Sequence, residues 1–386
     1  MDDGLARRAG DGRHGGVTGA FRNHFSSAYP GEGFDPDSRA MPQSGVLLPS
    51  YQSGSIQLTD GAVMPYVRVG TGERRLVMVP GAGDGLQTVK DAAAQLAWTY
   101  RHRAQGYTTL FVSRRIPLPQ GHAVEQHAQD YLETLDQLGW DEFLLECNSA
   151  GGPIGQVIAA TSPGRVQGLV LGSTAHRFDD DGAARVIKQW LQWLKTDRMG
   201  EFTWDTMVKT YRLAGRVNWL KPLAVPLLGV LARPRYGKER IINLLEELLQ
   251  RDTSEYLQQI NCPTMIFAGA QDPILGPELQ AEMAALIQNS ELYLVDGYLH
   301  GADLESPEYL THQSSACPCT RSGRARGPRT TRRCQAGVRN RHGVRHPGTT
   351  PARCRSKDRW HHLHSGSTHQ LRNRDGLRWD VRSASA

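Results

Sequence analysis

Short apolar runs alternate with stretches of helical periodicity along much of this chain, and that alternation limits the architectures open to it. One helical stretch carries Val124, Ala128, Tyr131 and Leu135 at a spacing of three or four residues, which is typical of a buried helix face. Strands that alternate with helices predict an α/β fold, in which a mostly parallel β-sheet is flanked by helices. The apolar runs predict strands at residues 55–58, 64–69, 76–79, 108–112, 143–145, 166–171, 264–268 and 292–295.

Residues 176–258 interrupt the alternation, because their pattern is helical throughout. We predict that this segment is a helical cap inserted over the ends of the strands. Two roles are open to its Trp and Leu side chains: they line an apolar substrate pocket, or they pack the cap on the rest of the fold. The segment holds four of the eight tryptophans, namely Trp190, Trp193, Trp204 and Trp219.

The two ends of the chain differ in composition from the part between them. Residues 1–50 lack apolar periodicity, so we expect a disordered N-terminal extension, and patterned sequence begins soon after Met41, a candidate start. Residues 321–386 hold 17 basic residues, 16 of them Arg, against 3 Asp and no Glu. We expect a disordered Arg-rich tail at 313–386, with a composition that suggests a frameshift, and an ordered domain at 51–312.

The net charge of +6 belongs to the tail, because residues 1–320 alone carry −8. The basic balance is therefore no argument for a specific nucleic-acid partner. No apolar run reaches the roughly 18–20 residues of a membrane span, and the N-terminus has no secretory signal pattern. We expect a cytoplasmic protein with no membrane partner. The Cys and His residues of the tail lack the paired spacing of a zinc site, so no metal or other cofactor is expected.

The segment Glu146-Cys147-Asn148-Ser149-Ala150-Gly151-Gly152 carries the strongest chemical signal. It follows a predicted strand and precedes a predicted helix. A serine on such a turn holds its hydroxyl above the edge of the sheet, and the helix N-terminus behind it supplies N–H groups for a developing oxyanion. Taken alone, a serine followed by small residues is also an ordinary tight turn.

Here the chain resembles the α/β-hydrolase fold family, whose nucleophile turn reads G-x-S-x-G and whose triad follows in the order Ser, acid, His. Cys147 stands where the first Gly of that motif is usual. Asp272, after the next-to-last strand, and His300, after the last, lie in segments similar to the acid and histidine loops of the family. The resemblance implies a triad of Ser149, Asp272 and His300, whereas Asp272-Pro273 alone also reads as a turn.

The loop Pro80-Gly81-Ala82-Gly83-Asp84-Gly85 follows the strand after which this family places part of its oxyanion hole. By position, the resemblance implies that the backbone N–H groups of Ala82 and Ala150 form the hole. A phosphate-binding loop is the competing interpretation, but G-x-G-x-x-G spacing and a following Gly-Lys-Ser/Thr are missing. Arg114 and Arg115, after another strand, read as a solvated loop or as partners of an anionic substrate.

The resemblance implies a serine hydrolase that acts on a small carboxylic ester or a related carbonyl substrate by acyl transfer, without a cofactor. Other activities on the same fold stay open, among them thioester, lactone, amide and C–C bond hydrolysis, lyase chemistry and cofactor-free haloperoxidase-type activity. A catalytically silent binding protein is the alternative from another class. The Arg-rich tail leaves a basic-tail interaction protein as a third.

Overall fold

The computed structural model describes residues 49–178, 182–306 and 309, and the backbone of 361–363, 368–372 and 378–382. Nearly all of the predicted N-terminal extension and most of the predicted tail lie outside the described residues, so these two predictions stay predictions. Three short strands are assigned within the tail segment. They are β9 (His361–Leu363), β10 (Thr368–Arg372) and β11 (Arg378–Arg382), of which β11 pairs with β8 through a single residue pair.

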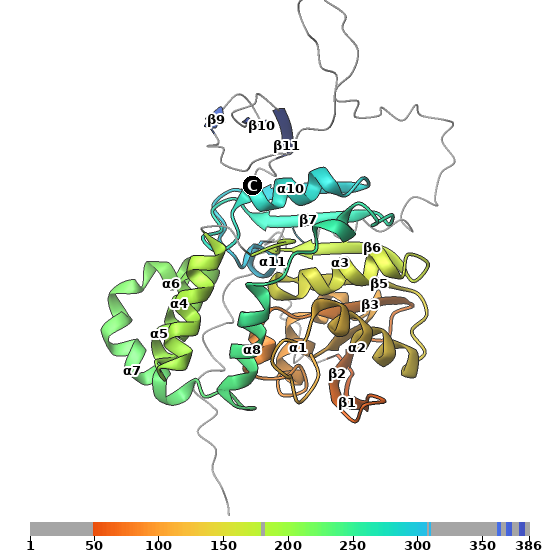
Figure 1. The fold of residues 1–386 in the computed structure, drawn as a ribbon, viewed down its shortest axis with the longest axis horizontal. Helices are drawn as coiled ribbons and strands as arrows, with labels where there is room; N and C mark the ends of the chain where they lie inside the picture. The colour runs from red at the N-terminus through yellow and green to blue at the C-terminus, as the bar shows by residue number, and fades with distance from the viewer. Residues whose placement is uncertain are drawn as a thin grey trace, which may run out of the picture. The chain divides into compact units, whose positions relative to one another are not determined.

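Eight strands form the sheet that positions the site, in the order β1-β2-β4-β3-β5-β6-β7-β8 (Figure 1). β1 and β2 form an antiparallel hairpin closed at Asp60-Gly61, β2 pairs antiparallel with β4, and the remaining neighbours are parallel. The predicted mostly parallel sheet is confirmed. The strands are β1 (Tyr51–Gln57), β2 (Val63–Val69), β3 (Arg74–Val79), β4 (Tyr107–Val112), β5 (Phe143–Asn148), β6 (Val166–Gly172), β7 (Thr264–Gly269) and β8 (Ser290–Val295).

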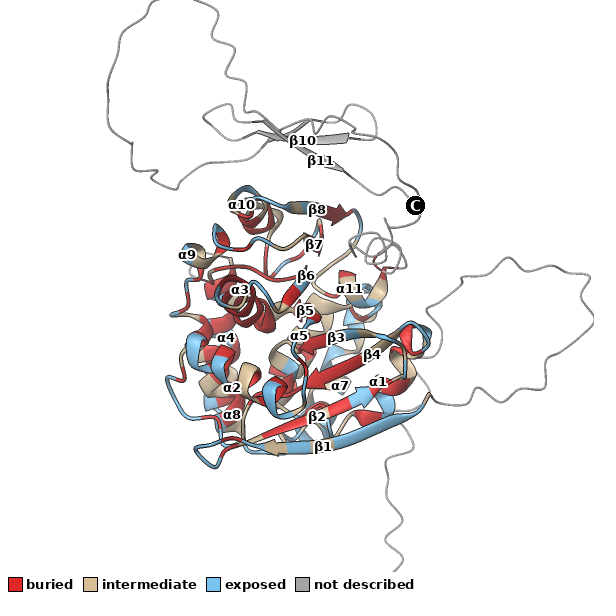
Figure 2. Ribbon diagram, turned by 90° about the vertical axis from the view of Figure 1, so that its right-hand side faces the viewer, coloured by how far each residue is buried: buried red, intermediate tan, exposed pale blue. Residues whose placement is uncertain are grey.

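Helices cover both faces of this sheet. Successive side chains of each strand point to opposite faces, so each buried strand contributes to a core on either side. Val77 and Val79 of β3 enter the core under α2 and α3, whereas Leu76 and Met78 enter the core under α1. The edge strand β1 is largely exposed, and the strands beside it are buried (Figure 2). The covering helices are α1 (Ala93–Thr99), α2 (Val124–Gln137), α3 (Gly152–Thr161), α9 (Ser254–Leu257), α10 (Pro277–Leu286) and α11 (Ala302–Glu305).

Between β6 and β7 the described chain is helical, and the helices α4 to α7 stand to one side of the sheet (Figure 1). α9 packs on α3 and α10 of the main body, and α8 packs against the loop that follows β3. One apolar core joins α4 and α8 to Ala150 of the predicted nucleophile turn and to Leu275 after β7. The other helices of this insertion are α4 (Ala183–Lys195), α5 (Met199–Thr210), α6 (Arg212–Arg216), η4 (Asn218–Leu220), α7 (Lys221–Leu231) and α8 (Lys238–Leu248).

Candidate active site

Ser149, Asp272 and His300 lie at the carboxyl ends of three parallel strands and meet at one edge of the sheet. Ser149 follows β5, Asp272 follows β7 and His300 follows β8. His300 Nε2 lies 2.9 Å from Ser149 Oγ, and His300 Nδ1 lies 2.7 Å from Asp272 Oδ2. The three side chains that the sequence analysis grouped therefore form one continuous chain of hydrogen bonds, with the imidazole between the hydroxyl and the carboxylate.

The turn that carries Ser149 is strained and closely packed. Ser149 has a φ of 49°, in the left-handed region that non-glycine residues rarely adopt. A Cβ on Gly151 would lie 2.6 Å from the carbonyl oxygen of Val79, and a Cβ on Gly152 would lie 2.0 Å from Thr174 Oγ1. The same Thr174 hydroxyl donates to the Ser149 carbonyl over 2.6 Å. The turn can close against β3 and the loop after β6 only because positions 151 and 152 lack side chains.

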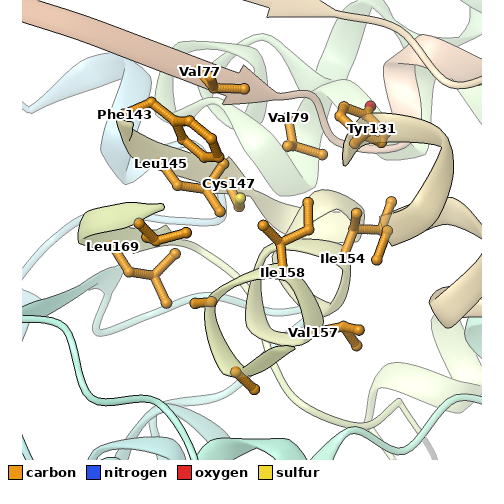
Figure 3. Packing of buried hydrophobic residues seen from close by; sticks show 14 of the residues in the cluster. Val77, Val79, Tyr131, Phe143, Leu145, Cys147, Ile154, Val157, Ile158 and Leu169 are labelled. Atoms are coloured by element: carbon orange, nitrogen blue, oxygen red, sulfur yellow. The ribbon is translucent and has the colours of Figure 1, made fainter. Parts of the chain in front are cut away.

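Cys147, at the position of the usual first glycine, is fully buried and points away from the turn. Its side chain packs among Val79, Leu145 and Ile158 in the core between β5 and α3 (Figure 3). Burial raises the pKa of the Cys147 thiol well above its usual value, and the nearby Glu146 adds to this. The thiol therefore stays protonated and acts as a small apolar side chain.

Backbone N–H groups hold the Asp272 carboxylate in place. Its Oδ1 accepts hydrogen bonds from Ile274 N over 2.8 Å and from Leu275 N over 3.0 Å, which leaves Oδ2 for the imidazole. Burial by itself lowers the pKa of His300, but Asp272 and, more weakly, Asp303 outweigh it, so the pKa is raised above its usual value. The arrangement fixes the orientation of the ring and stabilises an imidazolium.

Asp303, on α11, is a second acid beside the imidazole that the sequence analysis did not identify. Burial raises the pKa of this carboxyl to about 6, although His300 acts in the opposite direction. Ser173 Oγ donates to Asp303 Oδ1 over 3.4 Å. Asp303 lies three positions after His300 in the sequence. Neither periodicity nor motif spacing distinguishes it there from an ordinary exposed acidic residue.

Arg114 connects the two loops that were predicted to form an oxyanion hole. It is 1% exposed, and its guanidinium donates to the carbonyls of Pro80 (3.0 Å), Gly81 (3.2 Å) and Ala150 (2.9 Å). The interpretation of Arg114-Arg115 as a solvated loop or a partner of an anionic substrate is wrong. Both guanidiniums are largely enclosed, and Arg115 pairs with Asp60 and Asp130.

Ala82 and Ala150 begin short helical turns, so their N–H groups have no partner within those turns. Ala82 opens η1 (Ala82–Gly85) and Ala150 is the second residue of η3 (Ser149–Gly151). The two segments are close, since a Cβ on Gly81 would lie 3.1 Å from Ser149 Cβ. The loop that carries Ala82 therefore lies beside Ser149, and Ala150 follows Ser149 directly in the chain.

The buried carboxylate of Asp84 holds the η1 loop in position. Its Oδ2 accepts from the backbone N–H of Arg114 over 2.9 Å and from Arg240 Nη2 of α8 over 3.1 Å. Arg240 also donates to the Arg114 carbonyl over 2.9 Å. All three side chains are buried, so α8 of the insertion is tied to both loops at the site through a buried charged cluster.

The tryptophans of the insertion divide between core and surface. Trp190 and Trp204 are buried, and their indole N–H groups donate to Asp205 and Asn218. Trp219, in contrast, is 76% exposed. A surface hollow of about 520 Å³ lies at the opposite, amino-terminal edge of the sheet, next to Arg74 and Phe143, and none of the predicted site residues lines it.

Within the described part of the chain, His122, His127 and Asp130 form one cluster of metal-ligand types, with atoms within 4.8 Å of one another. Asp130 already pairs with His122 over 2.8 Å and with Arg115 over 3.1 Å. Burial, followed by Arg114 and Arg251 nearby, lowers the pKa of His127 well below its usual value. The guanidiniums around the cluster disfavour a bound cation, so we assign it a structural role.

Comparisons with known proteins agree with this architecture. The family model described as serine aminopeptidase, S33, matches residues 74–307. A protein named as a non-heme haloperoxidase from Mycobacterium phage D29 is 28% identical over 258 residues, which cover 66% of this chain and 90% of that protein. The structure of an alpha/beta hydrolase enzyme from a Medee basin deep-sea metagenome library matches with a TM-score of 0.57 at 18% identity, over 67% of this chain and 95% of that one.

The enol-lactonase from Burkholderia xenovorans LB400 matches with a TM-score of 0.54 at 17% identity, over 68% of this chain and 98% of that one. At these identities the solved structures show the fold alone. The family model, which spans more than half of the chain, shows the family as well.

Proposed function

Because this chain belongs to the serine aminopeptidase S33 family of α/β-hydrolases, we propose that it hydrolyses a small carboxylic ester or a related carbonyl compound, with Ser149, His300 and Asp272 as its catalytic triad. The observation that carries the proposal is the pair of hydrogen bonds made by His300, 2.9 Å to Ser149 Oγ and 2.7 Å to Asp272 Oδ2. A nucleophile, a base and an orienting acid in this order are what acyl transfer through a serine requires.

In the proposed reaction, His300 Nε2 takes the proton of Ser149 as Oγ attacks the substrate carbonyl. Asp272 keeps Nδ1 protonated and stabilises the imidazolium that forms. His300 then gives its proton to the departing alcohol, and the same imidazole activates the water that hydrolyses the acyl-enzyme. The raised pKa of His300 supports this role, because the imidazolium is favoured in the buried site.

We propose the backbone N–H groups of Ala82 and Ala150 as the donors to the oxyanion. Backbone donors need only the correct loop positions, and Arg114 supports these by its hydrogen bonds to Gly81 and Ala150. The loss of one such donor typically costs about 10²–10³ in rate. The position of Arg114 is therefore expected to matter for turnover although its side chain lies behind the site.

A cofactor-free haloperoxidase-type activity is the second candidate. It is favoured by the relative that is named as a non-heme haloperoxidase, which aligns with 66% of this chain at 28% identity. A catalytically silent binding protein is a third candidate, for which two features speak: a side chain at position 147, where the family has a glycine, and the altered tail. The burial of Cys147 away from the turn removes the first of these arguments.

A fluorophosphonate probe tests the proposal without knowledge of the substrate. We expect the probe to label wild-type protein at Ser149, as mapped by mass spectrometry, and to leave Ser149→Ala unlabelled. His300→Ala should label at least a hundredfold more slowly, because the hydroxyl then lacks its base. A screen of esters and lactones, and of halide-dependent oxidation with hydrogen peroxide, would then separate the two candidate activities.

The proposal fails if folded wild-type protein is not labelled, or if Ser149→Ala is labelled equally. The first result would favour a binding protein that keeps the fold without turnover. The second would mean that a residue other than Ser149 is the activated nucleophile.

A further inference from the structure

The cap carries an exposed apolar face that the folding of the chain does not explain. We call it the cap face and define it by Leu213 of α6, Trp219 of η4 and four side chains of α7. The six residues and their exposed fractions are Leu213 (61%), Trp219 (76%), Leu223 (76%), Leu227 (58%), Val230 (62%) and Leu231 (51%). Residues 219, 223, 227 and 230 or 231 are spaced by three or four positions, so they share one side of the helix. Isolated exposed leucines are ordinary, but several large apolar side chains exposed on one side of a helix are typical of an interaction surface.

The opposite side of α7 already makes the contacts that hold the cap together. Leu228 is buried, and α7 crosses α5 so closely that a Cβ on Gly200 would lie 2.1 Å from the Val225 carbonyl oxygen and 3.1 Å from Gly229 N. α6 and α7 form the outer part of the insertion, on the side away from the sheet (Figure 1). The cap face is thus turned outward from a helix that is packed on its other side.

The charged residues of the segment that carries the cap face are all basic. Residues 211–238 contain six basic residues and no Asp or Glu. The six are Arg212, Arg216, Lys221, Arg233, Arg235 and Lys238. Arg216, Lys221 and Arg233 are exposed, whereas the other three pair with acids of neighbouring segments. An exposed Trp and Leu face with basic residues at its border has the composition of a segment that lies in the interface of an anionic membrane.

We propose that the cap face docks on the surface of an anionic lipid membrane, with Trp219, Leu223 and Leu227 in the headgroup–acyl boundary. The expectation of no membrane partner rested on the lack of an apolar run long enough to span a bilayer. In the described part of the chain no helix is long and apolar enough to cross a bilayer, and α7 has only 11 residues. Docking of this kind needs no span. The Arg-rich tail is a poor alternative occupant, since its charge of +14 is repelled by the basic border.

The cap face begins next to the candidate active site. His300 N donates to the Lys209 carbonyl over 3.3 Å, and Gly301 N donates to the Thr210 carbonyl over 2.9 Å, so the end of α5 lies against the histidine loop. α6 and Leu213 follow directly. A docked cap would therefore hold the edge of the sheet that carries Ser149 near the lipid surface. The docking itself does not depend on turnover, and its test needs no activity.

Trp219 provides the test, in the full-length chain. Vesicles of phosphatidylcholine and phosphatidylglycerol, with bromine on the acyl chains, are added to wild type and to Trp219→Phe. The difference between their emission spectra isolates Trp219 from the other tryptophans. We expect the Trp219 emission to shift to the blue and to be quenched by at least about a third on anionic vesicles, and much less on phosphatidylcholine alone.

Leu223→Glu should raise the lipid concentration needed for half-maximal quenching by about tenfold or more, because a charge replaces an inserted side chain. Leu227→Glu is the second variant, and both positions are exposed, so circular dichroism should match wild type. Tyr51→Glu on β1, which makes the same change in charge at an exposed aromatic residue far along the chain from the cap, is the control and should quench as wild type does. At 0.5 M NaCl the purely electrostatic attraction of the tail is screened, whereas Trp219 quenching should be weakened but not lost, because the inserted apolar side chains do not depend on charge.

Two results would overturn the proposal. One is that the chain binds vesicles while the Trp219 emission and its quenching do not change, which would assign binding to the tail. The other is that sedimentation velocity shows a dimer that Leu223→Glu dissociates, with no Trp219 quenching by lipid. In that case the cap face is a contact between two copies of this chain.

Discussion

The sulfur of Cys147 occupies the space that a methyl group on Gly155 would take. A Cβ on Gly155 would lie 2.2 Å from Cys147 Sγ and 3.1 Å from Cys147 Cβ. The first glycine of the nucleophile turn has therefore been replaced without crowding Ser149, because the added side chain fits over a glycine of α3. The two residues allow α3 to pack close to β5, with the helix N-terminus behind Ser149, the proposed nucleophile.

Gly155→Ala is expected to destabilise the fold by about 1–3 kcal/mol, since an extra methyl in a packed core forces α3 and β5 apart. Cys147→Ala alone should cost about 1 kcal/mol through the small cavity that it leaves. The double variant should cost less than the sum of the two, with a coupling of at least about 1 kcal/mol. Denaturant melts of the four proteins measure this cycle.

Gly164→Ala is the control for the glycine change, because a Cβ at that position meets nothing within 4 Å. Its midpoint should stay close to that of wild type. Additive effects in the cycle would show that Cys147 and Gly155 do not share the space assigned to them.

The proposed catalytic triad was within reach of sequence analysis for a physical reason. Parallel strands place their carboxyl ends at one edge of the sheet, so Ser149, Asp272 and His300 converge although up to 151 positions separate them. The buried residues that support these loops, Arg114, Asp84 and Arg240, could not be predicted in the same way. Arg114 lies 30 residues from Asp84 and 126 from Arg240, and two adjacent arginines after a strand give no sign that one of them is fully buried.

The cap shows a second limit of sequence patterns. Leu223, Leu227 and Leu231 lie on one face of a helix. Their spacing alone does not distinguish a face that packs on the core from one that meets a partner outside the chain. In the structure this row is exposed, and Leu228 on the other side of α7 is buried. The helical pattern predicted for residues 176–258 includes this helix but does not give the direction in which it faces, because the contact with α5 depends on small residues such as Gly200 rather than on a row of large ones.

Asp84→Asn should lower the free energy of unfolding by about 3–5 kcal/mol. The substitution removes the carboxylate that faces two buried guanidiniums, those of Arg114 and Arg240, and uncompensated buried charge is costly. Urea or guanidinium melts measure the change as a lower midpoint.

Lys195→Gln provides the comparison, since it breaks an ion pair with Glu246 in which the lysine side chain is 53% exposed. We expect a loss of no more than about 1 kcal/mol there. Equal losses in the two variants would mean that the Asp84 cluster contributes no more than a surface pair.

Arg114→Lys is expected to slow the reaction of Ser149 with a fluorophosphonate by about tenfold or more. Lysine keeps the positive charge opposite Asp84, but one ammonium group cannot span the Pro80, Gly81 and Ala150 carbonyls that the guanidinium reaches. Small displacements of the oxyanion loops are costly in rate. The second-order labelling rate constant, measured on protein that is folded by circular dichroism, gives the effect.

Arg115→Lys makes the same change at the neighbouring residue, which pairs with Asp60 and Asp130 instead of these loops. Its labelling rate should stay within about threefold of wild type. A loss of rate of the same size in both variants would show that Arg114 has no special part in placing the loops.

Asp303→Asn should move the acid limb of the pH–rate profile to lower pH. His300 must be neutral to act as a base, so the labelling rate falls as the pH drops through the pKa of His300. Burial lowers that pKa, but Asp272 and the negative charge of Asp303 raise it above the usual value. Removal of the Asp303 charge therefore makes the imidazolium less stable, and His300 stays neutral down to a lower pH.

The effect should be largest above pH 6, because the pKa of Asp303 is raised to about 6 by burial and the carboxyl loses its charge below that point. Glu305→Gln on the same helix is the control, since Glu305 faces Arg212 and not the imidazole. The profile is measured as the fluorophosphonate labelling rate between about pH 4.5 and 8.5, roughly two units either side of the usual histidine value. An acid limb in Asp303→Asn that keeps its position or moves to higher pH would show that Asp303 does not act on His300 through its charge.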